Sequence, residues 1–360
     1  MNTPEEFATL HAGARRLAAA GGGAIATLLR TQGPVFRRAG TRMLIGRDGS
    51  IVRGLSAGCP QADLVTRTRA LFAQDGGACI VRYDREHGYD ALLELGCGGA
   101  MEILVETFGG ADELRYLDAV AALIHERDCG WLASWYASDG HCLPRPRRLL
   151  WHDGVRFDAL GDERVAGAIV AECERIPPGA TVATALRAGD QRIEVLIEPV
   201  APPLALFVVG DNDGAHALAR LGAMLGWQVT LVGHTEVGDT PPPRGVARLC
   251  VTPERVSTSL RLDARSAVVV MTHNLERDLD YLRALAHAAP GYLGALGSRT
   301  RARRLCAALG SSAPLLYAPA GLDIGAETPE AIALAIAAEI QAVMHGRNGG
   351  ALRLGDGPIH

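Results

Sequence analysis

The distribution of apolar residues changes in character near residue 200. From Leu204 onwards, short and wholly apolar runs alternate with longer segments whose apolar residues recur at helical spacing. Unbroken apolar runs of this kind are typical of strands buried on both faces of a parallel sheet. We therefore predict helices between strands at 204–209, 228–232, 267–271, 292–296 and 315–317. This alternation predicts a Rossmann-like, doubly wound parallel sheet over 203–346.

The first 110 residues have a mixed pattern. Helical spacing of Leu10, Ala14 and Leu17 predicts a helix over 5–20, and a second helix is expected from Pro60. Asp48-Gly49 is a signal for a two-residue hairpin turn. Short apolar runs predict strands at 24–29, 43–45, 51–55, 79–83, 91–95 and 101–106. We therefore predict an N-terminal α+β domain, 1–110, with a partly antiparallel sheet.

The segment 111–200 has weaker signals. We predict helices at 114–127 and 164–173, strands at 131–136 and 192–199, and a turn at the proline-containing cluster 144–148. This middle α+β segment is expected to pack with the N-terminal domain. The prolines at 199, 202 and 203 predict a stiff domain boundary, and the glycine-rich end, 347–360, predicts a mobile tail.

Composition excludes several classes of function. A net charge of -4 over 360 residues gives no reason to expect a nucleic acid partner, and no apolar run approaches the roughly 20 residues of a membrane span. All 36 basic residues are arginine, which excludes a P-loop lysine and Schiff-base chemistry. The eight cysteines form no C-x-x-C pair, and Met1–Arg16 has no basic segment ahead of an apolar one. We therefore expect a cytoplasmic protein with reduced thiols and no zinc site.

The turn after the first strand of the C-terminal half bears on nicotinamide binding. It reads Gly210-Asp211-Asn212-Asp213-Gly214-Ala215, so only Gly210 matches the G-x-G-x-x-G fingerprint. Asp211 and Asp213 would bring negative charge close to a pyrophosphate. The sequence thus argues against NAD(P), although an NAD(P)-dependent oxidoreductase built on this domain remains the alternative function. A scaffold that binds a different ligand, or none, is the simpler interpretation.

Five groups of residues, in order along the chain, resemble motifs of the xanthine dehydrogenase accessory factor family (XdhC/CoxI type). They are Ala39-Gly40-Thr41-Arg42-Met43 with Asp48-Gly49 and Ser56-Ala57-Gly58-Cys59, then Leu95-Gly96-Cys97-Gly98-Gly99-Ala100-Met101-Glu102, Met271-Thr272-His273 with Asp278, Tyr292-Leu293-Gly294-Ala295-Leu296-Gly297-Ser298-Arg299, and Ala320-Gly321-Leu322-Asp323-Ile324-Gly325-Ala326-Glu327-Thr328-Pro329-Glu330. The chain departs from the family pattern at Phe36, Ala57 and Gln61.

The resemblance implies a function that the composition does not. Proteins of this kind bind molybdenum cofactor, as molybdopterin or its nucleotide form, and help to insert it into hydroxylases such as xanthine, aldehyde or CO dehydrogenase. The implied role is that of a chaperone rather than an enzyme, so no catalytic residue is assigned. The implied partners are the client molybdenum hydroxylase, a cysteine desulfurase and a second copy of the chain in a homodimer. A scaffold that docks the client without carrying cofactor is a further alternative.

Two cysteines are the candidate molybdenum or sulfur contacts. Cys59 precedes Pro60 at an expected helix start, where the helix dipole lowers the pKa of a thiol. A thiolate there would hold the metal or pass on sulfur, whereas the alternative is a buried thiol without chemistry. Cys97 lies between glycines, where a ligand can approach the backbone, or it occupies an ordinary tight turn. We expect both thiols to face one cleft, and the resemblance adds Arg42, Gly58, Gly98 and Gly99 to the cofactor-binding group.

A second group of candidates lies at the expected ligand-binding edge of the C-terminal sheet. Gly297, Ser298 and Arg299 follow a strand, where they would bind the phosphate of the pterin. Asp323 would accept hydrogen bonds from pterin nitrogens or fix its own loop. His273 is either a ligand contact or a structural histidine, and Gly210 completes the set. The side chains of Arg301, Arg303 and Arg304 are predicted to form a solvated helix face outside the site.

Overall fold

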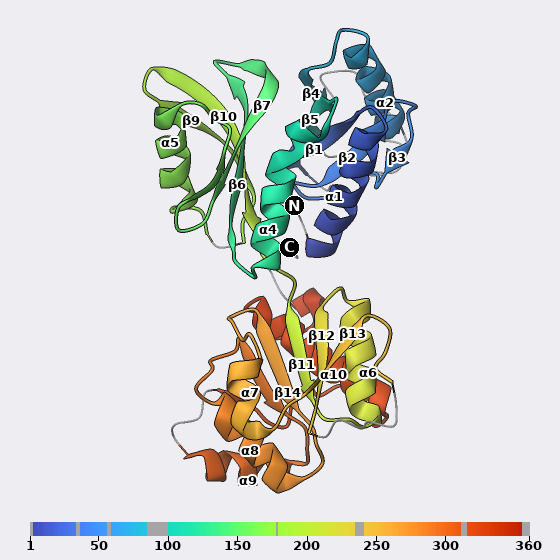
Figure 1. The fold of residues 1–360 in the computed structure, drawn as a ribbon, viewed down its shortest axis with the longest axis vertical. Coiled ribbons are helices and arrows are strands. Elements are labelled where there is room, and N and C mark those ends of the chain that lie inside the picture. The colour runs from blue at the N-terminus through green and yellow to red at the C-terminus, as the bar shows by residue number, and fades with distance from the viewer. Residues whose placement is uncertain are drawn as a thin grey trace. The chain divides into compact units, whose positions relative to one another are not determined.

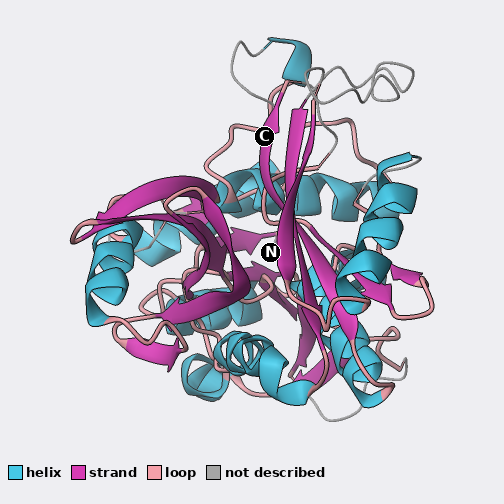
Figure 2. Cartoon of the chain, turned by 90° about the horizontal axis from the view of Figure 1, so that it is seen from above, coloured by secondary structure: helices cyan, strands magenta, loops and turns pink. Residues whose placement is uncertain are grey.

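The chain forms two compact units in the computed structural model, Met1–Pro202 and Pro203–His360, here called unit 1 and unit 2. The structure describes residues 3–33, 37–55, 59–84, 100–177, 179–234, 241–310 and 315–354, and of Cys59 only the backbone. Both units can be followed in Figures 1 and 2. Each unit is described separately below.

The first sheet of unit 1 has five antiparallel strands in the order β3-β2-β1-β5-β4 (Figure 1). The strands are β1 Gly23–Gln32, β2 Arg42–Gly46, β3 Ile51–Val52, β4 Ala78–Tyr83 and β5 Ala100–Phe108. The predicted hairpin at Asp48-Gly49 joins β2 to β3, and Gly49 has the positive φ, 87°, that such a turn requires. The sheet is antiparallel in every described pairing. The predicted strand at 91–95 lies outside the described residues.

Two helices cover opposite faces of this sheet. Helix α1, Pro4–Ala19, packs Leu10 and Ala14 in one cluster with Ile25 and Leu44. Helix α2, Cys59–Phe72, contributes Leu64 to a separate cluster. Its strand partners include Ala26, Met43 and Ile103. Successive residues of β1 and β2 therefore point to different cores, as the alternation of side chains along a strand dictates.

The second sheet of unit 1 is also antiparallel, in the order β8-β7-β6-β10-β9. Its strands are β6 Gly130–Ser138, β7 His141–Trp151, β8 Val155–Asp158, β9 Val182–Ala188 and β10 Gln191–Val200. The helical elements of this region are η1 Ala111–Leu114, α4 Arg115–His125 and α5 Glu163–Cys173. Leu29 and Leu104 of the first sheet meet Tyr136 and Leu196 of the second in one buried cluster. The two sheets therefore share part of their core.

The prediction of a turn at 144–148 is wrong, because β7 runs through it. Pro144 and Pro146 lie where the pairing of β7 with β6 shifts register, between the pairs of Trp135 and Ala137. Strand β8 pairs with β7 only from Leu149 onwards. Proline cannot donate a backbone hydrogen bond, so it is tolerated in a strand at such an irregular, singly paired stretch.

Unit 2 contains six parallel strands in the order β13-β12-β11-β14-β15-β16. The strands are β11 Ala205–Val209, β12 Gln228–Gly233, β13 Val246–Cys250, β14 Ser266–Val270, β15 Tyr292–Ala295 and β16 Leu316–Tyr317. The helices are α6 Asp213–Met224, α7 Pro253–Ser259, α8 Leu275–Leu285, α9 Arg299–Leu309, α10 Pro329–Met344 and the 3-10 turn η3 Leu352–Leu354. This strand order is that of a Rossmann fold, which confirms the predicted fold class: a Rossmann-like C-terminal sheet with an N-terminal α+β region.

Helices flank both faces of the parallel sheet (Figure 1). Leu218 of α6 and Ile336 of α10 belong to the core on one face, and Leu282 of α8 and Leu305 of α9 belong to the core on the other. The ends of two of these helices have favourable residues: Gly226 follows α6 with a φ of 77°, and Thr328 caps α10 ahead of Pro329. Within the described ranges, every helix is too short or too polar to cross a bilayer.

Candidate functional site

The loops that follow the parallel strands of unit 2 emerge at one edge of the sheet, because parallel strands share a direction. Gly210 follows β11, His273 follows β14, and Gly297 to Arg299 follow β15. Asp323 lies between β16 and α10. The topology therefore places these sequence-predicted residues along a single edge. We call it the carboxyl edge.

The end of β11 is joined closely to the end of β14. A Cβ atom added to Gly210 would lie 2.7 Å from the carbonyl oxygen of Met271, and Gly210 has a positive φ of 150°. The Asn212 side-chain nitrogen donates to that same carbonyl at 2.7 Å. Gly210 is thus required for the close approach of two backbone segments at the centre of the edge.

In the turn after β11, side chains of the protein occupy the hydrogen-bonding positions that a dinucleotide phosphate would use. The Asn212 side-chain oxygen accepts a hydrogen bond from the backbone N–H of Ala215 at 3.1 Å and so caps α6. Asp211 pairs with Arg248 at 3.0 Å, and one of its oxygens lies 2.7 Å from Nε2 of His216. A pyrophosphate at this helix start would compete with the Asn212 cap and face the Asp211 carboxylate.

A hollow of about 420 Å³ lies beside the same turn, where α6 and α10 begin. Its charged lining residues are Asp211, Asp213, Glu330, His216 and Arg220. Three carboxylates against one arginine and one histidine make this surface unfavourable for a phosphate group. The hollow strengthens the argument from the sequence against an ordinary nicotinamide dinucleotide.

A buried carboxylate connects two loops of the carboxyl edge. Asp278 of α8 is fully buried. It accepts hydrogen bonds from the backbone N–H of Thr272 at 3.1 Å and from the Thr272 hydroxyl at 2.5 Å. Arg301 of α9 donates to its other oxygen at 2.6 Å. We call Thr272, Asp278 and Arg301 the aspartate clamp, because they fasten the loop after β14 to the start of α9.

The prediction that Arg301 is exposed to solvent is wrong. Arg301 was expected on a solvated helix face together with Arg303 and Arg304, and only the latter two are exposed. The Arg301 guanidinium instead turns toward Asp278 and is largely shielded from solvent. A buried carboxylate needs a charged or hydrogen-bonding partner, and Arg301 supplies it.

Three polar side chains of the carboxyl edge have no partner among the residues that the structure describes. His273 is exposed and has a φ of 62°, a left-handed conformation that is uncommon outside glycine. Arg299 lies exposed in the first turn of α9, and Asp323 is exposed in its loop. Within the described residues, these three side chains form no hydrogen bond or ion pair. A left-handed non-glycine residue such as His273, next to a loop that the clamp fixes, is a feature often found at functional sites.

Gly297 and Ser298 shape the start of α9. Gly297 has a positive φ of 157°, and an added Cβ would lie 2.5 Å from the side chain of Arg301. The Ser298 hydroxyl accepts from the backbone N–H of Arg301 at 3.2 Å and so caps the helix. Because a hydroxyl also carries a proton, Ser298 can still donate to a ligand.

The candidates of unit 1 are described only in part. Helix α2 begins at Cys59, which confirms the expected helix start. The thiol of Cys59 lies outside the described residues, as do Gly58, Cys97, Gly98 and Gly99. Among the described side chains, no group of three or more His, Cys, Asp or Glu residues could hold a metal ion. The role of the two thiols therefore stays a prediction.

Arg42 is held by a buried ion pair. Its two terminal nitrogens donate to the two carboxylate oxygens of Glu198 at 2.8 and 2.5 Å, which joins β2 to β10. Burial alone would raise the pKa of Glu198, but charge attraction and hydrogen bonds, of which the attraction to Arg42 is the largest, lower it to about 2. Of the Arg42 nitrogens, only Nε is buried without a partner. In this structure Arg42 therefore serves first to hold the two sheets of unit 1 together.

Two family models match the chain. The model described as the XdhC Rossmann domain matches residues 206–340, which span the parallel sheet of unit 2. The model described as the XdhC and CoxI family matches residues 16–84, in the first sheet of unit 1.

Full-length relatives agree with both matches. A Bacillus subtilis protein, named as a probable subunit of xanthine dehydrogenase, is 27% identical over 88% of this chain and 91% of its own length. The Escherichia coli molybdenum cofactor insertion chaperone PaoD is 25% identical over 89% of this chain and 83% of its own length. A crystal structure from Bacillus halodurans, described as a xanthine dehydrogenase, shares the fold, with a TM-score of 0.72 and 21% identity over 95% of this chain and 98% of that one. The chain belongs to the XdhC and CoxI family, and unit 2 is its XdhC Rossmann domain.

Proposed function

We propose that the protein binds molybdenum cofactor in the cytoplasm and helps to insert it into a molybdenum hydroxylase, without turning over a substrate itself. A relative that matches over most of both chains is named a molybdenum cofactor insertion chaperone, which supports this proposal. The structural observation that carries it is the carboxyl edge, where the exposed side chains of His273, Arg299 and Asp323 have no partner among the described residues. The aspartate clamp fixes the loop after β14, which carries His273, to the start of α9, which carries Arg299.

The chemistry of this edge suits a phosphorylated pterin. Arg299 offers a guanidinium whose forked donors match phosphate oxygens, and Ser298 adds a hydroxyl. A pterin presents ring N–H and amino donors, for which the Asp323 carboxylate is a suitable acceptor. His273 can donate or accept at the same edge. In unit 1, Cys59 and Cys97 stay candidate molybdenum or sulfur contacts, and the assay below tests them separately.

Cofactor retention tests the proposal directly. Protein co-expressed with the cofactor synthesis pathway is purified, and its released small molecules are measured by mass spectrometry. We expect the wild type to carry pterin and the triple variant His273→Ala/Arg299→Ala/Asp323→Ala to carry at least about tenfold less, since charge-assisted hydrogen bonds contribute roughly 1.5–3 kcal/mol each. Cys59→Ser and Cys97→Ser test the thiols in the same assay, together with activation of a co-expressed hydroxylase.

The double variant Arg303→Ala/Arg304→Ala is the matched control, because it removes two exposed cations of the same helix that lie outside the site. It should retain cofactor as the wild type does. A wild type that carries no pterin would refute the proposed function. A triple variant that is as fully loaded as the wild type would refute the assignment of the site.

Nicotinamide binding distinguishes the proposed function from the alternative, a nicotinamide-dependent oxidoreductase. We expect that titration of the purified protein with NADH or NADPH gives no saturable fluorescence change up to about 1 mM ligand. Even a Kd of about 1 mM would correspond to only about 4 kcal/mol of binding free energy. The physical reason is the Asp211 carboxylate and the Asn212 cap at the start of α6. Saturation at micromolar concentration, in protein that carries no pterin, would favour the oxidoreductase.

A further inference from the structure

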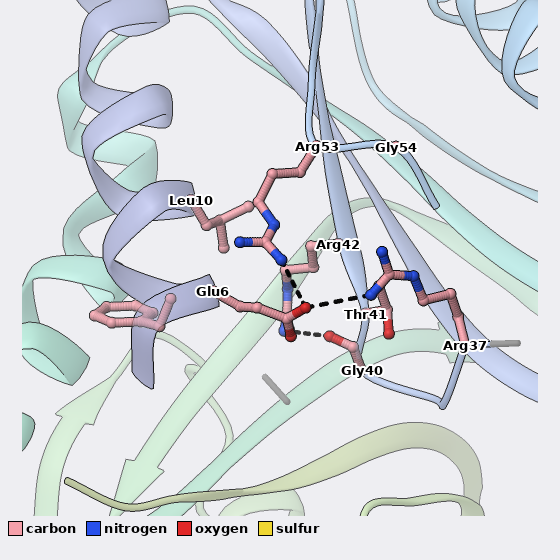
Figure 3. A pocket seen from close by; sticks show the side chains of 9 residues that line it. Glu6, Leu10, Arg37, Gly40, Thr41, Arg42, Arg53 and Gly54 are labelled. Atoms are coloured by element: carbon pink, nitrogen blue, oxygen red, sulfur yellow. Dashed lines mark hydrogen bonds and ion pairs between the residues drawn. The ribbon is translucent and has the colours of Figure 1, made fainter. Parts of the chain in front are cut away.

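A small pocket in unit 1 is lined by three arginines and a single acid. Arg37, Arg42 and Arg53 line it with Glu6 of α1, and Gly40 and Gly54 lie in the same wall (Figure 3). With Glu6 in place, the free space is about 20 Å³, which is room for roughly one water molecule. The pocket belongs entirely to unit 1 and is separate from the carboxyl edge of unit 2. We call it the arginine pocket.

Two of the arginines share one carboxylate oxygen. Oε1 of Glu6 lies 2.7 Å from a terminal nitrogen of Arg53 and 3.3 Å from one of Arg37, and Figure 3 shows the carboxylate pointing between them. The third arginine, Arg42, is instead bound by Glu198. Arg37 and Arg53 therefore bring two positive charges to the single negative charge of Glu6. A dianion in the same place would balance both.

The Glu6 carboxylate has an alternative hydrogen-bond partner, the backbone N–H of Thr3. Glu6 is the third residue of α1, and the Thr3 side chain caps the helix by accepting from the Glu6 backbone N–H at 3.1 Å. In a complete capping box, the acid at this position would accept the N–H of the capping residue in return. Among the described residues, nothing accepts the Thr3 N–H, because the Glu6 carboxylate is turned toward Arg53. Because an acid at this helix position can reach the N–H of the capping residue, rotation of the Glu6 side chain would exchange the two arginines for that N–H.

The backbone presents Arg53 to the pocket at an energetic cost. Arg53 has a φ of 56°, a left-handed conformation that costs a non-glycine residue on the order of 1–3 kcal/mol. Such a conformation persists only where the surroundings enforce it, and ligand-binding sites are among the places where it recurs. The arginine fork suits phosphate because it donates two parallel hydrogen bonds to neighbouring oxygens.

We propose that the arginine pocket binds a phosphate dianion, free or as a monoester, and that Glu6 holds its place until the ligand arrives. Arg37 and Arg53 grip the phosphate oxygens, and the displaced Glu6 carboxylate moves to the Thr3 N–H. No bond is made or broken, so Glu6 acts only as an internal competitor. The inference goes beyond the proposed function, since it requires only a phosphate group and not a pterin.

Removing the internal competitor should strengthen phosphate binding. The affinity of the full chain for inorganic phosphate and for phenyl phosphate is measured at pH 7.5 by calorimetry, in the wild type and in Glu6→Gln. We expect Glu6→Gln to bind about tenfold more tightly, the factor that corresponds to two partly exposed ion pairs. The ligand that binds more tightly shows whether the pocket takes free phosphate or the ester.

Three further variants make the outcome decisive. Glu5→Gln, the neighbouring exposed acid outside the pocket, should bind as the wild type does. Arg37→Gln/Arg53→Gln should lose phosphate binding, and Glu6→Gln/Arg53→Gln should lose the tenfold gain. If Glu6→Gln unfolds more easily, phosphate should raise its melting temperature more than that of the wild type. Equal affinity in Glu6→Gln and the wild type, or a gain that survives Arg53→Gln, would overturn the proposal.

Discussion

Replacing Arg42 with methionine is expected to lower the free energy of unfolding of unit 1 by about 3–5 kcal/mol. The variant removes the guanidinium that binds both oxygens of Glu198, a carboxylate with no exposed surface. Desolvation of that charge is then no longer offset by its strongest partner. Three of the four tryptophans, Trp131, Trp135 and Trp151, lie in the second sheet of unit 1, and the fourth, Trp227, lies in unit 2. Urea unfolding followed by tryptophan fluorescence in a Trp227→Phe background therefore reports on unit 1.

A double variant distinguishes the contribution of the ion pair to stability from the contribution of the volume that its two side chains fill. Because a buried pair replaced by apolar side chains of similar volume is often as stable as before, Arg42→Met/Glu198→Leu should recover most of the lost stability. Arg16→Met, at the exposed end of α1, is the control and should change stability by less than about 0.5 kcal/mol. A single Arg42→Met variant within about 1 kcal/mol of the wild type would show that Glu198 has a sufficient partner elsewhere.

Acid titration offers an independent measurement of the same pair. Burial alone would raise the pKa of Glu198, but charge attraction and hydrogen bonds, above all from Arg42, lower it from the ordinary 4.5 to about 2 in the folded protein. The unfolded chain therefore takes up this proton first as the pH falls. The contribution of Glu198 is fully present above about pH 4.5 and is lost as the pH falls through the window toward 2. The double variant Arg42→Met/Glu198→Leu should lack this part of the acid sensitivity.

Apolar runs predict best the strands that are buried on both faces, because almost every residue of such a strand is apolar. Every residue of β14 is buried, and its neighbour β11 is almost as enclosed, so both read as unbroken apolar runs. The strands β7, β8, β9 and β13 were not predicted. Three of them, β8, β9 and β13, lie at a sheet edge and are mostly half-exposed or exposed, and β7 contains Pro144 and Pro146. An edge strand faces solvent along one side, which weakens the pattern on which such predictions rest.

The position of the candidate site could be predicted, but its internal bonding could not. A residue that follows a parallel strand must lie at the carboxyl edge, so His273 and Arg299 were placed by topology alone. The partner of Asp278 is 23 residues distant, and the partner of Arg42 is 156 residues distant. No local spacing encodes such pairs. Arg301 was assigned to solvent because it neighbours Arg303 on a helix whose charged residues are otherwise exposed.

The aspartate clamp leads to the last prediction. Asp278→Ala should lower the free energy of unfolding of unit 2 by about 2–4 kcal/mol, because it leaves the Thr272 N–H and a largely shielded Arg301 without their acceptor. Hydrogen exchange should show the loss first at the Thr272 amide, which donates directly to Asp278. Asp280→Ala is the control, since this acid of the same helix is exposed and pairs only with Arg283 nearby.

The same variant distinguishes a positioning role from direct contact with the ligand. Asp278 is fully buried, so it acts through Thr272 and Arg301, which fix the loops that carry His273 and Arg299. Asp278→Asn lacks the charge and keeps a single acceptor oxygen, which can still accept from Thr272 while its NH2 group faces Arg301. It should therefore restore part of the Thr272 amide protection and of the cofactor retention that Asp278→Ala loses. In a double-mutant cycle, Asp278→Ala and Arg301→Met should be strongly non-additive. If the two substitutions add independently, Arg301 does not act through Asp278, and the carboxyl edge is held by other contacts.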